Sequence, residues 1–370
     1  MENISSNNQD RSELSIKAQI KKFAITSLYG FNTIILIGMS RKLGIFEYLY
    51  ENTKPITNPN NYIVIKFTLN ELAEKLNLDV NHLDAWLHLA LECDLFEIDD
   101  RSQKILKTAP FVYELLIDYN HSSYIGGTLG AFYNIALSQE MMLKSFTTGE
   151  AMDLLKLPGD IVKDLQERSK RFGRLIEEVF SKSFSDFCKI LDEKGSILEV
   201  GCGYGSNIET WAKKYENARF VGIDIDPQGI KFAQKLIEQK MWNDRIKILN
   251  ISTNKYAHTT KDKYDLIILN QVLHEMNPNE KYRKQIFEDL YLLLKDKGIL
   301  LIGESMVPDT FAHKQPFKLF DITHKFSEVG SSRFYDERTL KTLIGSTPFR
   351  KVEFIKEGGI KFWVIRKKNN

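Results

Sequence analysis

Apolar and polar positions follow two different patterns along the chain, and the change falls near residue 190. Before it, apolar residues recur at the three- and four-residue spacing of helices, most clearly from about 17 to 50, where Gly44 marks a break before a short second helix. From Ser196 onward, short apolar runs alternate with amphipathic stretches. This alternation predicts a mostly helical amino-terminal part followed by an α/β sheet domain.

Five apolar runs in the second part have the length and composition of buried strands. They cover residues 196–200, 219–223, 246–250, 264–269 and 298–303. After a predicted helix at 336–345, the stretch "KVEFIKEGGIKFWVIRKK" contains two more strands, and the Gly358–Gly359 turn between them is too short to hold a crossover helix. The sequence therefore predicts a Rossmann-like, seven-stranded sheet with an antiparallel last strand.

The amino-terminal part contains the elements of a winged helix. Thr68 and Glu71 form a capping-box pattern at the start of one short helix, and Asp79 can cap the next. The following stretch, "LFEIDDRSQKILKT", is typical of two strands that turn at 99–102. A winged helix that binds DNA needs Lys or Arg for the phosphates, whereas residues 79–100 contain seven acids and neither Lys nor Arg. We therefore expect this domain to pack against protein and not to bind nucleic acid.

These patterns divide the chain into four predicted segments. They are a flexible polar tail (1–16), a winged-helix domain (17–109), a helical connector that contributes to a substrate pocket (110–189) and the sheet domain (190–370).

Composition and charge limit the classes of partner and the cellular compartment that we expect for this protein. The 51 basic residues nearly balance the 49 acidic ones, so the net charge of +2 favours neither nucleic acid nor an anionic membrane. The most apolar early run, 33–39, is far too short to span a bilayer, and the polar start lacks a signal-peptide pattern. The three cysteines have no metal-ligand or disulfide-like spacing. We expect a cytoplasmic protein without a metal ion or a membrane partner.

A glycine-rich loop follows the first predicted strand of the sheet, in "ILEVGCGYGSN". Its three glycines, between that strand and a helix, are Gly201, Gly203 and Gly205. Such a loop brings backbone N–H groups close to a nucleotide. Glu199 just before it would repel a pyrophosphate but can pair with a cationic amino-acid ligand, and Asp224 ends the next strand, where it can accept both ribose hydroxyls. A structural turn and an NAD site are the alternatives, although an NAD fingerprint would place glycine where Ser206 stands.

This constellation resembles motif I and its partner acid in class I S-adenosylmethionine (SAM) methyltransferases, whose fold also ends in an antiparallel hairpin. The resemblance implies SAM as the cofactor and S-adenosylhomocysteine (SAH) as its product. The cofactor-binding residues that it implies are Glu199, Gly201, Gly203, Gly205, Asp224, Ile225, Ser252, Asn270 and Gln271. In place of the family's adenine-binding Asp the chain offers Asn250, Ser252 or Asn254, of which Ser252 aligns best.

A histidine, His274, follows the fourth strand in "LILNQVLHEM". In a sheet of this topology the first and fourth strands are neighbours, so Asn270, Gln271 and His274 are expected near the cofactor at the carboxyl ends of the strands. A histidine in this place can act as a base, or it can do no more than cap a helix.

The chain is also similar to small-molecule O-methyltransferases with an N-terminal winged-helix dimerisation domain. The similarity lies in "LGIFEYL", "YIGG", "FTTGE" and the stretch 272–276, which matches a V-L-H-D-W motif. It implies a homodimer in which His274 deprotonates a hydroxyl and Glu304 orients the base or the substrate. A second family carboxylate is missing, because Ser332 stands at its position. Three acids could replace it: Asp321, Glu328 and Asp336.

A long insertion between the fifth strand and the last predicted helix carries the candidate acceptor site. Its rings are Phe311, His313, Phe317, Phe320, His324, Phe326, Phe334 and Tyr335. Such an insertion above the strand ends is typical of a lid over an apolar or aromatic acceptor, and the alternative is an aromatic core. The candidate substrate contacts are Phe132, Tyr133, Phe320 and His324, with Tyr124 beside the first two.

The sequence thus favours a biosynthetic, SAM-dependent O-methyltransferase. Its acceptor is expected to be a small molecule, aromatic or a secondary metabolite, and His274 is the candidate base. A phenol needs such a base because its pKa is about 10, whereas a carboxylate acceptor needs none. Two alternatives are a carboxyl- or N-methyltransferase acting on a peptide or metabolite, and a non-catalytic regulatory protein that binds SAM.

Overall fold

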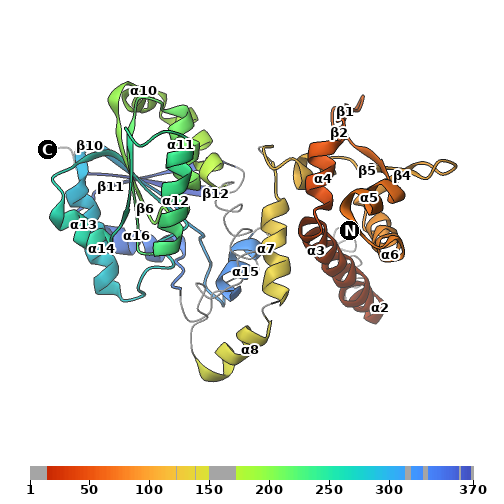
Figure 1. Ribbon diagram of the computed structural model, residues 1–370. Coiled ribbons are helices and arrows are strands. Elements are labelled where there is room, and N and C mark those ends of the chain that lie inside the picture. The colour runs from red at the N-terminus through yellow and green to blue at the C-terminus, as the bar shows by residue number, and fades with distance from the viewer. Residues whose placement is uncertain are drawn as a thin grey trace, which may run out of the picture. The chain divides into compact units, whose positions relative to one another are not determined.

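The computed structural model describes residues 15–121, 123–137, 139–149, 172–312, 318–327, 332–357 and 360–367. It divides into two compact units, Met1–Ser138 and Gln139–Asn370 (Figure 1). This division falls inside the segment 110–189 that the sequence analysis treats as a single connector. The first part of that segment belongs to the amino-terminal unit, because its helix α7 (Gly126–Leu137) packs against the early helix α3 (Ser27–Lys42).

The amino-terminal unit begins with a continuous helical run. It is made of α2 (Ile16–Ile20), the π-helical stretch η1 (Lys21–Thr26) and α3. Gly44 ends the run with a φ of +75°, a left-handed conformation that glycine adopts without steric cost, and α4 (Ile45–Asn52) follows. The break predicted at Gly44 is therefore confirmed.

This first helical run lies within the stretch of helical spacing predicted from about residue 17, and its residues 19–31 are exposed. By length and composition, the helix Ile16–Lys42 could cross a membrane, and 22% of its most apolar part is buried inside the protein. The apolar run 33–39, which by itself is too short to span a bilayer, is thus part of a longer apolar helix. The same criterion is met by a helix that is buried in the core of a protein, so length and composition alone do not assign this helix to a membrane.

Two short helices and a small sheet complete this unit. Thr68 caps α5 (Leu69–Leu76), and Asp79 caps α6 (Val80–Glu92) by accepting two backbone N–H groups, as predicted. The predicted hairpin is also present. The strands of the unit are β1 (Ile56–Thr57), β2 (Ile63–Val64), β3 (Lys66–Thr68), β4 (Phe96–Asp100) and β5 (Ile105–Thr108), with a π-helical turn η2 (Tyr113–Ile117) after them. Strand β5 pairs with both β3 and β4 in one antiparallel sheet.

The carboxyl-terminal unit is built on a seven-stranded sheet with the order β11-β12-β10-β9-β6-β7-β8. The strands are β6 (Ser196–Val200), β7 (Arg219–Asp224), β8 (Ile246–Asn250), β9 (Tyr264–Asn270), β10 (Leu294–Gly303), β11 (Lys351–Glu357) and β12 (Ile360–Arg366). Strand β12 is antiparallel to both of its neighbours, β10 and β11. The predicted seven-stranded sheet with an antiparallel last strand is therefore confirmed, while the Gly358–Gly359 turn lies outside the described residues.

Helices cover both faces of this sheet (Figure 1). They are the helical residues 172–183, α10 (Ser185–Lys194), α11 (Ser206–Lys214), α12 (Pro227–Gln239), α13 (Thr253–Thr259), α14 (Glu280–Leu293) and α16 (Glu337–Gly345). Two further helices of this unit, α8 (Gln139–Thr148) and α15 (Leu319–Ser327), lie away from the faces of the sheet. One apolar core joins the sheet to 172–183, α10, α11 and α12, and a second joins it to α13, α14 and α16. The strands are apolar along almost their whole length because both faces are buried.

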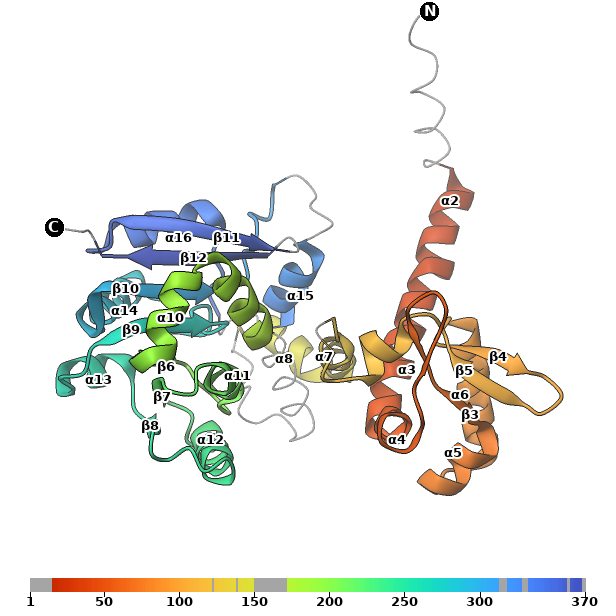
Figure 2. The ribbon, with the colours of Figure 1, turned by 90° about the horizontal axis from the view of Figure 1, so that it is seen from above.

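The register of the parallel strands brings four strand ends to one edge of the sheet. Val200 pairs with Leu269 and with Ile223, and Asn270 pairs with Gly303. Strands β10, β9, β6, β7 and β8 follow one another in the sheet (Figure 2). The loops after β6, β7, β9 and β10 therefore leave the sheet side by side. Ligands in open α/β sheets bind at this carboxyl edge, where the strand order reverses.

Candidate cofactor site and active site

The glycine loop between β6 and α11 has three residues in the left-handed region. Gly201, Gly203 and Gly205 have φ values of +71°, +46° and +78°. A Cβ on Gly201 would lie 2.2 Å from Cγ2 of Val272, so the loop packs directly against the residues that follow β9. A Cβ on Gly203 would meet nothing within 4 Å. The loop is therefore tight against the protein at Gly201 and open at Gly203, where a ligand can approach the backbone.

Replacing Gly201 with alanine is expected to destabilise the protein much more than replacing Gly203. Both variants strain the backbone, but only Gly201→Ala also collides with Val272, so together the two effects cost roughly 2–5 kcal/mol. Chemical unfolding of both variants measures the difference. Adding Val272→Ala to Gly201→Ala should recover part of the loss, and an equal loss of stability in the two single variants would contradict the predicted contact.

Glu199 is buried at the end of β6 and lacks a cationic partner among the described residues. One of its oxygens accepts a hydrogen bond from the Asn207 amide at 2.9 Å, and its Oε2 has no partner among the described atoms. Burial, together with the nearby charge of Asp224, raises the pKa of Glu199 to about 8 despite the hydrogen bond from Asn207. Such a carboxyl group is ready to pair with a cation that the ligand brings, for example the ammonium group of an amino acid.

Asp224 stands at the end of β7 and holds the glycine loop. Its two oxygens accept the N–H groups of Gly203 at 2.7 Å and of Asp226 at 2.9 Å. Each oxygen keeps capacity for a further hydrogen bond, for example from a ribose hydroxyl. The next residue, Ile225, is 75% exposed beside it, which is unusual for a large apolar side chain and fits a wall for a planar ring.

Ser252, the candidate adenine contact, lies after β8 as expected and also has a structural task. Its hydroxyl caps α13 by accepting the N–H of Lys255 at 3.4 Å. The amide of Asn250 donates to the backbone oxygen of Asp224, and the amide of Asn254 donates to Asp289. A serine hydroxyl that accepts at a cap can still donate to a ligand, so Ser252 stays a prediction.

The end of β9 carries the two predicted amides, and the second one is in an unusual backbone conformation. Gln271 has a φ of +56°, a left-handed value that costs a residue with a side chain of the order of 1 kcal/mol or more. Its N–H donates to the oxygen of Gly303 at 2.7 Å, and its Oε1 accepts the hydroxyl of Ser305 at 3.1 Å. The turn after β9 is thus tied to the end of β10, and this tie directs the chain toward His274.

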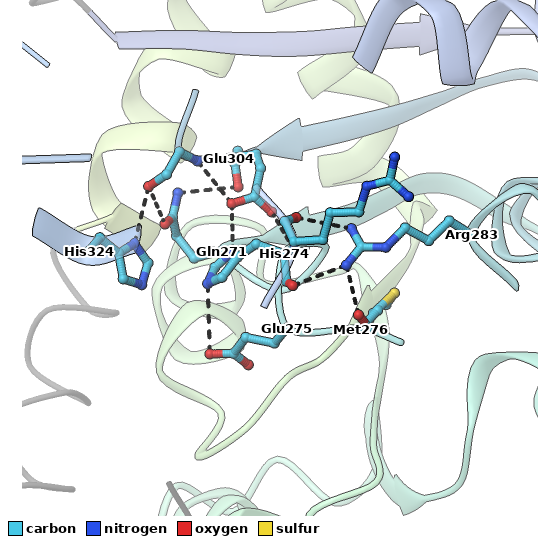
Figure 3. A network of polar contacts seen from close by, with 10 residues as sticks. Gln271, His274, Glu275, Met276, Arg283, Glu304 and His324 are labelled. Atoms are coloured by element: carbon cyan, nitrogen blue, oxygen red, sulfur yellow. Dashed lines mark hydrogen bonds and ion pairs between the residues drawn. The ribbon is translucent and has the colours of Figure 1, made fainter. Parts of the chain in front are cut away.

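His274 and Glu304 form a buried pair at this edge of the sheet (Figure 3). His274 Nδ1 lies 2.6 Å from Oε1 of Glu304, and the His274 N–H donates to Oε2 at 3.1 Å. Burial raises the pKa of Glu304, but the charge and hydrogen bonds of His274 and the N–H of Ser305 outweigh it, so the net pKa lies below the ordinary value. Glu304 is therefore a carboxylate at neutral pH, and it holds the proton of the imidazole on Nδ1.

Two aromatic rings enclose the His274 imidazole. Phe334 stacks on it with ring centroids 4.8 Å apart, and His324 on α15 meets it edge-on at 4.7 Å. His324 Nδ1 lies 3.3 Å from the hydroxyl of Ser305, which links it to Gln271. The imidazole of His274 thus stands between a carboxylate and an aromatic ring, which excludes the simple surface cap considered from the sequence.

Two of the three candidates for the missing second carboxylate bind other partners. Asp321 pairs with Lys318, Asp336 caps α16, and Glu328 lies outside the described residues. On the other side of the ring, Oε1 of the neighbouring Glu275 lies 3.8 Å from His274 Nε2, which is an ion-pair distance. Glu304 therefore hydrogen-bonds the Nδ1 side of the ring, and Glu275 stands farther from Nε2.

The predicted acceptor residues fall in both units. Phe320 and His324 lie on α15, and His324 contacts His274. Phe132 and Tyr133 belong to α7 of the amino-terminal unit, where Tyr133 packs against Gly38, and Tyr124 accepts a hydrogen bond from Arg41. In the lid, Phe334 and Tyr335 are packed, Phe326 contacts Phe146, Phe311 is exposed, and His313 and Phe317 lie outside the described residues.

Three residues of the site were not identified from the sequence. Asn207 donates to Glu199, Ser305 joins Gln271 to His324, and the buried Arg283 binds the backbone around His274. Asn207 and Ser305 adjoin predicted residues in the sequence, so their proximity was a usable signal. Arg283 lies nine residues after His274 on a helix of alternating charges, and nothing in that pattern separates it from a surface arginine. Within the described residues, no three His, Cys, Asp or Glu are placed to hold a metal ion.

Comparisons with known proteins identify the domain. Residues 198–300 match a protein-family model described as a methyltransferase domain. One similar curated protein is the tRNA1(Val) (adenine(37)-N6)-methyltransferase of Haemophilus influenzae, 32% identical over 76 residues, which are 20% of this chain and 33% of that protein. Another is the erythromycin 3''-O-methyltransferase of Saccharopolyspora erythraea, 27% identical over 114 residues, 31% of this chain and 36% of that protein. The chain thus spans less than half the length of these curated relatives.

Solved structures resemble nearly the whole chain. Human N-acetylserotonin methyltransferase in complex with SAM has a TM-score of 0.64 and 17% identity, over 95% of this chain and 98% of that chain. PigF with SAH has a TM-score of 0.67 and 14% identity, over 96% and 100%. Identities this low show a shared fold. Three features suit such a cofactor. Glu199 Oε2, which has no partner among the described atoms, can bind its ammonium group, and the open space at Gly203 lets the cofactor approach the backbone. The exposed Ile225 can contact its adenine ring. The chain has the fold of class I methyltransferases, and its residues 198–300 match a methyltransferase domain.

Proposed function

We propose that the protein is a SAM-dependent O-methyltransferase that methylates a hydroxyl of a small, aromatic or secondary-metabolite acceptor. The observation that carries this proposal is the buried His274–Glu304 pair at the carboxyl edge of the sheet. It lies beside the cofactor loop, because Gly201 of that loop packs against Val272, two residues before His274. A base this close to the methyl donor is useful for an acceptor that must lose a proton.

In this mechanism the protein moves one proton and holds the acceptor in line. SAM supplies an activated methyl group when it is bound. Glu304 keeps the His274 proton on Nδ1, so Nε2 carries the lone pair that takes the proton of the acceptor hydroxyl. The imidazolium that forms is stabilised by the Glu304 carboxylate. Phe334 and the buried neighbours keep water from the base, and alignment of acceptor and methyl group supplies the rest of the rate gain.

The setting of His274 supports a hydroxyl acceptor over a carboxylate one. Among the described residues, the rings next to His274 are those of Phe334 and His324. The guanidinium of Arg283 donates to the carbonyl of His274. Arg333 contacts that carbonyl through its backbone N–H and pairs its own guanidinium with Glu280. A carboxylate acceptor would need a cation at the ring, whereas an aromatic alcohol matches an aromatic wall.

The decisive experiment uses SAM with an isotope-labelled methyl group and a panel of matched acceptors. The panel pairs phenols with the corresponding benzoic acids, anilines and methyl ethers. We expect label in the phenols and none in the methyl ethers, which have no free hydroxyl. Label confined to the acids or amines would overturn O-methylation and favour the alternative of a carboxyl- or N-methyltransferase, with a peptide or metabolite acceptor.

One observation favours that alternative: Ser332 stands where the family has its second carboxylate, and Asp321 and Asp336 bind other partners. An acceptor that is already ionised would not need a complete base assembly. A regulatory protein that binds SAM without turnover is the third alternative, and SAM binding without transfer to any acceptor class would favour it.

We include in the proposal a cytoplasmic homodimer formed through the amino-terminal domain, which we interpret as a winged helix. Large apolar side chains are exposed along its first helical run: Ile16, Ile20, Phe23, Ile25, Leu28, Tyr29 and Phe31. A row of this kind is typical of an interface. The acidic stretch 79–100 supports a protein partner over nucleic acid.

Charges on that helical run are expected to separate the subunits. The double variant Phe23→Glu/Leu28→Glu should shift the protein from dimer to monomer in light scattering coupled to gel filtration. Ile98→Glu, which charges an exposed apolar position on β4, serves as the control and should leave the dimer intact. A monomeric wild type, or a wild type that co-floats with lipid vesicles, would refute the cytoplasmic homodimer.

A further inference from the structure

Arg283 is a fully buried arginine that donates four hydrogen bonds to backbone carbonyls. From the start of α14, its Nε donates to the oxygen of Asn277 at 3.0 Å, and its Nη2 donates to those of Met276 at 2.7 Å and His274 at 3.1 Å (Figure 3). Its Nη1 donates to the oxygen of Arg333 at 3.3 Å. The guanidinium also lies over the ring of Tyr335, 5.2 Å from its centroid. Among the described residues no carboxylate pairs with it.

A buried charge without an acid partner is costly, so its retention needs a reason. Burial lowers the pKa of Arg283, and the side chain of Tyr335 and the more distant charge of Glu304 offset this effect only in part. A methionine of similar length could fill the same space without this cost. What an apolar side chain cannot do is hold four carbonyl groups in a fixed arrangement, and a lysine cannot reach them all because its donors share one nitrogen.

The carbonyls that Arg283 holds come from the two segments that surround the His274 ring. The first segment is the turn 274–277, which carries the imidazole. The second is 333–335, whose Phe334 stacks on the imidazole, and the N–H of Arg333 donates to the oxygen of His274 at 2.8 Å. His274 is thus fixed at its N–H and Nδ1 by Glu304, and at its carbonyl by Arg283 and the 333–335 segment.

We infer that Arg283 is a positioning residue of the active site, which clamps the His274 turn to the Phe334 segment and so holds the imidazole in register with Glu304. Its link to catalysis rests on the proposed function of His274, but its effect on the ring does not. Loss of the clamp should let the 274–277 turn open locally, while the sheet, the glycine loop and the Glu199 site stay folded.

The test needs neither a cofactor nor an acceptor. In protein labelled at its histidine rings with nitrogen-15, the Nδ1 proton of His274 is expected to exchange slowly with water, because it is buried and bonded to Glu304. The His274→Gln variant, which lacks the signal, assigns it. In Arg283→Met the exchange should become about tenfold faster, as expected when local hydrogen bonds are lost. Arg283→Lys keeps the charge and should show the same increase, which preserves the test if the methionine variant does not fold.

Arg245 provides a matched control. Arg245 also donates to three backbone carbonyls, those of Ala212, Tyr215 and Ala218. It lies over the rings of Phe220 and Trp242, and burial lowers its pKa. It differs in position, because it lies just before β8, at the amino ends of the parallel strands. Arg245→Met should lower the melting temperature yet leave the His274 exchange rate within about twofold of wild type. Unchanged exchange in both Arg283 variants, or an equal increase in Arg245→Met, would overturn the inference.

Methyl-transfer assays then separate this inference from the proposed function. If a hydroxyl acceptor is methylated, Arg283→Lys should lower kcat about 100-fold while the dissociation constant of SAM stays within twofold, since the clamp acts on the base and not on the cofactor site. If no acceptor is methylated, the proposed function fails and the exchange experiment still decides the position of His274.

Discussion

Replacing Glu199 with glutamine is expected to make the cofactor-free protein more stable and, at the same time, to weaken its binding of SAM. The carboxyl group is buried, and burial raises its pKa to about 8, so folding holds the group neutral well above the pH at which it would ionise in the unfolded chain. Glutamine has the same shape and no charge to bury. The native glutamate thus lowers the stability of the cofactor-free protein, but it provides a carboxylate that can bind a cation.

The pH dependence of this effect has a definite sign. A pKa raised on folding gives a stability that is fully present below the unfolded pKa, about 4.5, and is lost as the pH rises through about 8. Glu199→Gln removes that loss, so its stability gain should be near zero at pH 4.5 and grow to roughly 3 kcal/mol by pH 7. Urea unfolding of the cofactor-free protein at several pH values measures it.

SAM binding should change in the opposite direction. The ammonium group of the cofactor needs the carboxylate form of Glu199, so binding should release a proton from the enzyme and become tighter as the pH rises from 6 toward 7.5. In Glu199→Gln the affinity should fall about 100-fold and its pH dependence should flatten. Calorimetry in buffers of different ionisation enthalpy counts the released proton.

Glu177→Gln is the control for this prediction. Glu177 is also a buried glutamate, but it pairs with Lys214 and Tyr215 at the far end of α11. Its replacement should lower stability and leave SAM affinity unchanged. A Glu199→Gln variant that binds SAM like the wild type would show that the unpartnered oxygen does not face the cofactor.

Replacing His274 with glutamine is expected to lower kcat by about 10²- to 10⁴-fold with a hydroxyl acceptor, the usual contribution of a general base. Glu304→Gln should lower kcat by a similar factor, because it removes the carboxylate that fixes the Nδ1 proton and stabilises the imidazolium. The double variant should lose little more than either single one, since the two groups act as a unit. SAM affinity should stay within about twofold in all three.

His258→Gln is the matched control for the histidine. His258 is a half-exposed histidine beside Asp289 on α13, away from the strand ends, and its loss should leave kcat unchanged. Because the pKa of Glu304 lies below its ordinary value, its support for His274 is present above about pH 4.5 and is lost only as the pH falls through that lower pKa. Full activity in His274→Gln would remove the base from the mechanism and leave SAM as the cofactor.

The strands and helix caps of this protein were predictable because their causes are local. The glycine loop, the caps at Thr68 and Asp79 and the break at Gly44 each follow from one or two residues. Strand limits came within a residue or two, except that β10 begins at Leu294, four residues before the predicted start at 298. The charged stretch after Leu294 hides that start, because it lies on a part of the strand exposed to solvent.

Some features of the site depend on residues far apart in sequence, and no local pattern contains them. The left-handed Gln271 follows from its bonds to the end of β10, and Ser305 reaches His324 only because α15 returns to that edge. The division of the chain at residue 138 follows from the packing of α7 on α3. Long-range packing of this kind overrides what the neighbouring residues favour.

The sequence by itself determined the α/β fold, the cofactor loop and the residues that end each strand, since alternation, glycine and capping chemistry act over a few residues. Only the tertiary structure decided how His274 is held. Its partner Glu304 lies 30 residues away in the sequence. Arg283 cannot be distinguished from a surface arginine in the sequence, and only the packing of α14 buries it. The physical reason is that burial and hydrogen-bond geometry, which turn ordinary side chains into a site, exist only once distant segments are brought together.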